Sequence, residues 1–138
     1  MADTLSAAIG TAMALTLFPS ENAAVRTIVS NTTEKQIPIT LFRSGAVDNI
    51  NPQRFSKTPY PPSDRPRGQA NIDSVKHHRR TVRQKGRIES PIWVAKKGKK
   101  LIMLDGVHRT VATYLERKRT VPAFVVNLTR RRRWRSRP

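Results

Sequence analysis

The residues best suited to chemistry are five consecutive ones, Asp105-Gly106-Val107-His108-Arg109, which follow an apolar run and open an amphipathic segment. A glycine at a bend lets the backbone turn sharply and lets a ligand approach where a side chain would block it. When a helix starts directly after the bend, the free N–H groups of its first turn favour an anion. Arg109 adds a charged donor for phosphate oxygens, and His108 adds a donor close to developing charge. We therefore predict a phosphate-binding site at residues 105–109.

Asp105 has several roles open to it in such a site. It positions a ribose hydroxyl, a magnesium ion or the turn itself. A purely structural alternative also fits a lone Asp-Gly pair before a helix, in which Asp105 caps the helix and Gly106 turns the chain. The wider order of elements favours the phosphate site over this alternative.

Positive charge is concentrated in the second half of the chain. Residues 1–70 carry seven Lys/Arg against five Asp/Glu, whereas residues 71–138 carry twenty against four. Such a field attracts polyanions, with nucleic acid the commonest, followed by anionic membrane surfaces and acidic proteins. No base-reading module is visible, so we expect DNA binding governed by charge, with weak sequence preference.

The residues expected to contact nucleic acid lie on a basic helix and in a C-terminal tail. Each arginine neutralises a backbone phosphate, and the tryptophan within the arginine run stacks on an exposed base. These residues are Arg79, Arg80, Arg83, Arg87, Arg130, Arg131, Arg132, Arg133, Trp134 and Arg135. The lysine-rich turn at residues 96–100 is a further candidate, with a solvated hairpin tip as its equal alternative.

The absence of cysteine excludes disulfides, thiolate zinc sites and cysteine nucleophiles. The three histidines, at positions 77, 78 and 108, have no nearby acid that completes a metal site, so we expect no metal held by the protein alone. A magnesium ion carried by a bound nucleotide is the expected exception. The candidates for catalytic roles are Asp105, His108 and Asp48.

Apolar spacing predicts the elements around the bend. Ile72, Val75 and Val82 lie on one face of an amphipathic helix that stops at Gly86. The expected elements after it are strand 91–95, turn 96–99, strand 100–104, helix 107–117 and strand 120–126.

The first half of the chain gives weaker signals. A helix is expected over residues 3–17, no clear period appears over 21–35, and a strand is expected over 36–42 with Pro38 near its beginning or at a sheet edge. A loop follows through residue 54. Four prolines then predict an irregular linker or surface loop over residues 58–68.

These elements divide the chain into three parts. Residues 1–35 form a helical segment suited to assembly or to binding a protein partner, residues 36–126 form the folded domain, and residues 127–138 form an arginine-rich tail. The apolar N-terminal run is too short to span a bilayer and lacks a basic leader, so no transmembrane segment is expected. We expect a cytoplasmic or nucleic-acid-associated protein, with a virion as an alternative location.

The order of these elements resembles the ParB N-terminal and sulfiredoxin-like fold. The resemblance is clearest from Ile72 to Val126, where Lys85-Gly86, Pro91-Ile92-Trp93-Val94 and the Asp-Gly-x-His-Arg bend occur in the family's order. It implies an α/β (α+β) fold with a small mixed sheet, and a bend that binds the phosphates of ATP or CTP with Mg²⁺.

The same resemblance separates the family's activities. Sulfiredoxins carry their catalytic cysteine where this chain has Val107, so sulfinic-acid repair is excluded. ParB proteins bind and hydrolyse CTP with a Gly-Glu-Arg-Arg-like bend, which His108 and Arg109 match in part. Free serine kinases carry Asp-Gly-His-His-Arg with a catalytic glutamate far upstream, where the nearest acids of this chain are Asp48 and Asp64.

Three hypotheses follow. The leading one is a domain that binds a nucleotide or phosphate at the bend and nucleic acid through its basic helix and tail. The alternative is a non-enzymatic structural or packaging protein, for example of a viral or phage particle, whose basic surface holds nucleic acid or an acidic partner. A small phosphotransferase or nuclease is the third, with Asp48, Glu89 and Asp105 as its candidate carboxylates.

Overall fold

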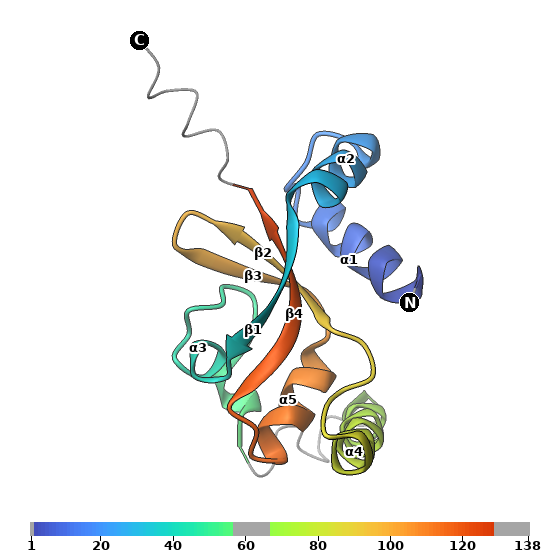
Figure 1. Cartoon of the computed structure of the whole chain (residues 1–138), viewed down its shortest axis with the longest axis vertical. Helices are drawn as coiled ribbons and strands as arrows, with labels where there is room; N and C mark the ends of the chain where they lie inside the picture. Colours follow the sequence, from blue (N-terminus) through green and yellow to red (C-terminus); the bar gives the residue numbers. More distant parts are fainter. Residues whose placement is uncertain (1, 57–66, 129–138) are drawn as a thin grey trace.

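The computed structural model describes residues 2–56 and 67–128, with a mixed four-stranded sheet at its centre (Figure 1). The strand order is β1-β4-β2-β3. β1 (Thr32–Pro38) is antiparallel to β4 (Thr120–Asn127), which is parallel to β2 (Ile92–Lys97), and β2 forms an antiparallel hairpin with β3 (Lys100–Asp105). The predicted α/β fold with a small mixed sheet is therefore confirmed.

Helices cover both faces of the sheet. α1 (Ala2–Ala14) and α2 (Glu21–Asn31) lie on one face, and α5 (Val107–Leu115) lies on the other, with α4 (Arg67–Lys85) packed outside it (Figure 1). The short α3 (Thr40–Arg43) and the 3₁₀ turn η1 (Pro52–Arg54) join the α5 face. None of the helices in this part of the chain combines the length and the apolar character needed to cross a bilayer.

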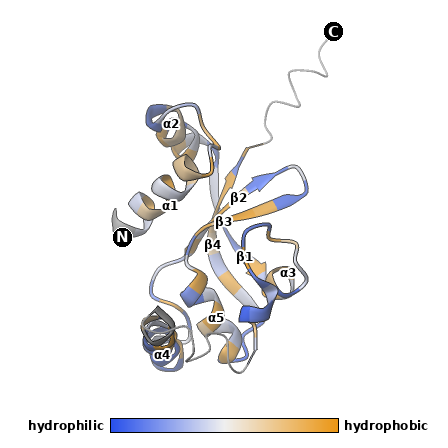
Figure 2. Cartoon of the chain, turned by 180° about the vertical axis from the view of Figure 1, so that it is seen from behind, coloured by the Kyte–Doolittle hydropathy of each residue, from blue (hydrophilic) through white to orange (hydrophobic). Residues whose placement is uncertain are grey.

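The central strand β2 contributes to the core on both faces. Its residues alternate in direction, so that Ile92 and Val94 pack under α5 while Trp93 and Ala95 pack under α1. The four buried residues of β2, Ile92 to Ala95, are accordingly all apolar, as is common for a strand in parallel pairing with both faces covered, and the strand ends in the exposed Lys96 and Lys97. In Figure 2 the β2–β3 hairpin is hydrophobic along its strands and hydrophilic near its tip.

The elements nearest to the bend agree with the sequence predictions. The structure has the hairpin with its turn at residues 98–99, the amphipathic helix that ends before Gly86, the helix after the bend and the closing strand. Gly86 has a φ of 83° and donates its N–H to the carbonyl of Val82 at 2.8 Å, which closes the last turn of α4.

The N-terminal predictions need correction at two places. The first helix ends at Ala14 instead of residue 17, because Thr16 adopts a left-handed backbone with a φ of 54°. Residues 21–31, which showed no period, form α2, capped by the Ser20 hydroxyl that accepts from the Ala23 N–H at 3.1 Å. Only Ala24 and Ile28 of this helix are buried, which leaves little periodic signal.

Further corrections concern the segment before the proline-rich region. The expected strand 36–42 is instead β1 at residues 32–38 followed by α3, because pairing with β4 begins at Thr32 and Pro38 ends the ladder. The expected loop contains η1, which Asn51 caps by accepting from the Gln53 N–H at 3.0 Å. The expected proline-rich loop lies largely outside the described residues, and α4 already begins at Arg67.

Candidate functional site

The bend at the end of β3 strongly favours a glycine at its centre. Gly106 has a φ of 112° and precedes the first residue of α5. A Cβ at this position would lie 2.6 Å from Ile92 Cγ2 and 2.7 Å from Arg109 Nη2. As the N-cap residue, Gly106 offers no side-chain acceptor to the first-turn N–H groups of α5. Because Gly106 has no side chain, a ligand can approach the start of α5 closely, where the positive end of the helix favours an anion.

Arg109 is held in place by the aspartate on the other side of the glycine. Its Nη2 donates to Asp105 Oδ2 at 2.8 Å, and the arginine side chain is only 9% exposed. No described residue accepts a hydrogen bond from its Nε or Nη1. Asp105 therefore neutralises and orients a buried guanidinium, a role different from capping the helix through the N-cap position.

All five bend residues line one cavity, of about 490 Å³. The structure adds three polar side chains that the sequence did not assign to this site: Thr11 of α1, Asn49 of the loop after α3, and His78 of α4. Asn49 is fixed by two hydrogen bonds with the backbone of Met103, of 2.8 and 2.7 Å. Together with the bend, these three side chains place four separate segments of the chain around the cavity, so no local sequence pattern could have grouped them.

The cavity's two histidines are biased toward the neutral form. Burial is the largest cause that lowers the pKa of His78 from 6.5 to about 4; the neighbouring His77, Arg109 and His108 act in the same direction, and Glu89 opposes them. Burial also lowers the pKa of His108, and the carboxylate of Asp105 opposes this shift. His108 Nε2 lies 2.9 Å from Asn71 Oδ1. At neutral pH the cationic side chain in the cavity lining is therefore Arg109.

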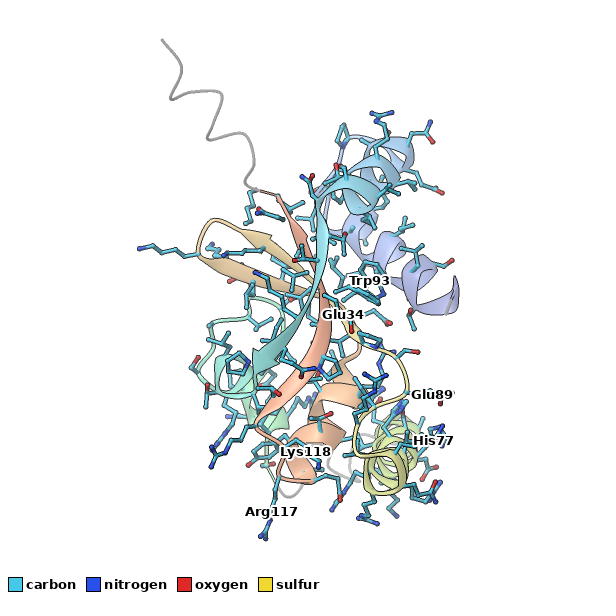
Figure 3. The ribbon with its side chains drawn as sticks, in the orientation of Figure 1. Glu34, His77, Glu89, Trp93, Arg117 and Lys118 are labelled. Carbon is cyan, nitrogen blue, oxygen red and sulfur yellow. The ribbon has the colours of Figure 1, made fainter. Side chains whose placement is uncertain are left out.

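The other candidate carboxylates do not line this cavity. Asp48 is exposed beside the opposite end of β3, where its Oδ2 lies 3.8 Å from Lys100 Nζ. Glu89 is exposed in the loop between α4 and β2 and acts on His78 only through its charge (Figure 3). Among the residues described, Asp105 is the one carboxylate in the lining, and no cluster of three metal-ligating side chains forms.

The predicted basic helix is partly neutralised inside the molecule. Arg79 and Arg83 both bind the carboxylate of Glu116, the latter at 2.9 Å. These two hydrogen bonds, with that of Arg83 the stronger influence, lower the pKa of Glu116 although burial opposes them. Arg80 and Arg87 are exposed, as are the lysines of the hairpin tip. Residues Arg130 to Arg135, including Trp134, lie outside the described part of the chain.

No protein-family profile and no curated protein matches this chain. Among solved structures, the chain is similar to a sulfiredoxin from Arabidopsis thaliana, with 16% identity and a TM-score of 0.42. The similarity covers 67% of this chain and 83% of the sulfiredoxin.

Proposed function

We propose that this chain binds a nucleoside triphosphate, ATP or CTP, or another phosphate at Gly106 to Arg109, and binds nucleic acid through its basic surface. The observation that carries the first part is the buried guanidinium of Arg109, oriented by Asp105 at the start of α5. A guanidinium whose position is already fixed loses little conformational freedom when it donates hydrogen bonds to a phosphate.

The other features of the cavity support an anionic ligand of limited size. Its volume of about 490 Å³ is within the range of small-molecule sites. The positive N-terminus of α5 and the neutral imidazole donors of His78 and His108 border the same space. Asp105 offers a carboxylate oxygen for a nucleotide's magnesium ion or a ribose hydroxyl in addition to its bond with Arg109.

Binding is the function that this lining supports best. A general base for chemistry on a phosphate would be a carboxylate or a neutral imidazole, and the imidazoles of His78 and His108 also line the cavity. The one carboxylate among the described lining residues already pairs with Arg109. We propose no role for Asp48 or Glu89 in the cavity, since both are exposed outside its lining.

The nucleic-acid part of the proposal is supported by exposed cations. Arg80 and Arg87 have no ion-pair partner among the described residues, whereas Arg79 and Arg83 share one carboxylate and together keep one positive charge in excess. The six arginines of residues 130–137 contribute their charge from the sequence. Binding through such groups depends on counterion release and weakens steeply with salt.

The structural or packaging alternative is favoured by one separate observation. Two valines one turn apart on α2 are exposed, Val25 at 41% and Val29 at 80%. Exposed apolar side chains on a helix favour contact with another protein. A packaging protein would bind DNA through its charge while the Asp105–Arg109 cavity takes up no nucleotide.

The test is calorimetric titration of the full chain with ATP and CTP, each with Mg²⁺, with and without DNA. We expect saturable binding that Arg109→Lys weakens at least tenfold, because lysine keeps the charge but lacks the planar pair of donors. Arg26→Lys on α2 is the matched control and should bind as the wild type does. Circular dichroism checks that each variant is folded.

Two results would contradict the nucleotide proposal. One is that the wild-type chain gives no saturable binding signal with either ATP or CTP. The other is equal nucleotide affinity for wild type and Arg109→Lys. Salt-dependent DNA binding without nucleotide binding would favour the packaging alternative.

A further inference from the structure

A second concave surface lies at the opposite end of α5 from the bend. This surface, here called the basic groove, has a volume of about 730 Å³ and lies between the end of β1, α3 and the turn that joins α5 to β4. Five of its described lining residues are cations, and none is an acid: Arg43, Arg79, Arg117, Lys118 and Arg119. Apart from Arg79, none of these cations belongs to a site expected from the sequence.

Most of this charge has no internal partner. Arg79 pairs with Glu116, and Arg43 stacks its guanidinium over the ring of Tyr114 at 5.2 Å. Within the described chain, no carboxylate lies within ion-pair distance of Arg117, Lys118 or Arg119. All three are exposed, and Figure 3 shows the side chain of Arg117 extending away from the ribbon. The groove therefore presents uncompensated positive charge to solvent.

Arg117 adopts a backbone conformation that glycine would adopt with less strain. Arg117 has a φ of 61° and ends α5 in a Schellman arrangement, with Lys118 N–H donating to Thr113 O at 3.2 Å and Arg117 N–H to Tyr114 O at 2.9 Å. Glycine is the usual residue at this position, since a side chain costs roughly 1 kcal/mol in the left-handed region. Lys118 and Arg119 already supply positive charge to the helix C-terminus, so the helix dipole does not require arginine at 117.

The groove continues into a neighbouring hollow. Lys118 and Arg119 also line a smaller cavity of about 220 Å³ together with Arg87, which was predicted from the sequence to contact nucleic acid. One basic surface thus runs from Arg43 across the α5–β4 turn to the end of α4. Several exposed cations on one continuous surface can neutralise several phosphates of a phosphodiester backbone.

We propose that the basic groove binds the phosphodiester backbone of nucleic acid. This inference rests on the proposed nucleic-acid function and assigns to it a surface separate from the tail. An acidic protein is the less suitable partner, because stable protein interfaces have an apolar centre and few lysines. The groove has apolar lining residues, but Ile39 is buried and Tyr114 and Leu115 are partly buried. The exposed side chains at the turn are instead cations and the hydroxyl of Thr120.

The test is the affinity of the full chain for a fluorescent 20-base-pair DNA between 50 and 200 mM salt, measured by anisotropy. For each phosphate that a variant no longer neutralises, the ratio of Kd at 200 mM to Kd at 50 mM should fall by about 3.5-fold. Arg117→Gly should therefore lower this ratio and weaken binding while raising Tm, because glycine removes the backbone strain. Lys118→Gln/Arg119→Gln should lower the ratio further, and Arg26→Gln on α2 serves as the charge-matched control.

The outcomes separate this inference from the proposal on which it rests. If DNA binding and its salt dependence are the same in wild type and in the groove variants, the groove is not a nucleic-acid surface, although the wider function stands. If the wild type binds no DNA at 50 mM salt, both are wrong. If polyglutamate binds as tightly as DNA and the groove variants weaken both equally, recognition of a phosphodiester backbone is contradicted.

Discussion

Gly106 determines the geometry of the candidate site, and its replacement should be costly. In Gly106→Ala the new Cβ would contact Ile92 and Arg109 at less than 3 Å, at a φ of 112°. Strain and overpacking together should lower the free energy of unfolding by roughly 2–4 kcal/mol. Urea denaturation measures this change.

The chain provides a matched control for that substitution. Gly10 lies in α1, where an added Cβ would meet no atom within 4 Å and the backbone is ordinary helix. Gly10→Ala should raise stability by up to about 1 kcal/mol, because alanine favours the helix. Equal effects of the two substitutions would contradict the steric account of the bend.

At the level of elements, the outer edge of β3 pairs with a loop instead of a strand: the Asp48 N–H donates to the Leu101 carbonyl at 2.9 Å, and Asn49 continues the pairing with its side chain. The Asn49 carboxamide donates to the Met103 carbonyl and accepts from its N–H, as a neighbouring strand would. Asn49→Ala should cost about 1–3 kcal/mol, because it leaves two partly buried backbone groups without partners. It should also speed hydrogen exchange at the Met103 amide. Asn22→Ala on the exposed start of α2 is the control, and unchanged exchange at Met103 would contradict this role.

The elements that sequence could predict are those with strong local patterns. Hairpin β2–β3, α4 and α5 each carry an apolar period and a glycine at a turn. The sequence predicted the hairpin, the end of α4 and the start of α5 close to their observed positions, whereas α4 begins at Arg67, five residues before the first apolar position of the predicted helix. The parallel pairing of β2 with β4 could not be predicted, because it depends on contacts between distant residues. β1 was misplaced for the same reason, since its register is set by β4.

The candidate site follows the same division. Residues 105–109 are consecutive, so glycine chemistry and helix onset could identify them from the sequence. Asn49, His78 and Thr11 join the lining only through the tertiary fold. The cations after α5 were missed because Glu116 to Arg119 has the appearance of an ordinary polar turn until the left-handed φ of Arg117 is known.

For the molecule as a whole, acid should weaken the fold in two separate stages. His78 has a pKa lowered from 6.5 to about 4, so the unfolded chain binds more protons than the folded chain between these values. Stability should fall as pH decreases from 6.5 to 4, and His108 contributes in the same direction. Glu116 acts later, since its lowered pKa removes stabilisation only as pH falls below about 4.5.

Urea denaturation at pH 7, 5.5 and 4 measures this dependence. His78→Gln should flatten the change between pH 6.5 and 4.5, because the glutamine does not titrate. If the free energy of unfolding changes equally with pH in wild type and variant over this range, His78 is not the cause of the change.

Thr11 of α1 forms part of the cavity lining, while α1 itself packs on the sheet through Ala8 and Ala12. A ligand that contacts both α1 and the bend would therefore hold the N-terminal helix against the domain. By thermodynamic reciprocity, any partner that draws α1 away from the sheet would weaken that ligand's binding by the same factor. Ligand binding in the cavity and release of the N-terminal helix to other proteins would therefore oppose each other, because both depend on whether α1 is docked on the sheet.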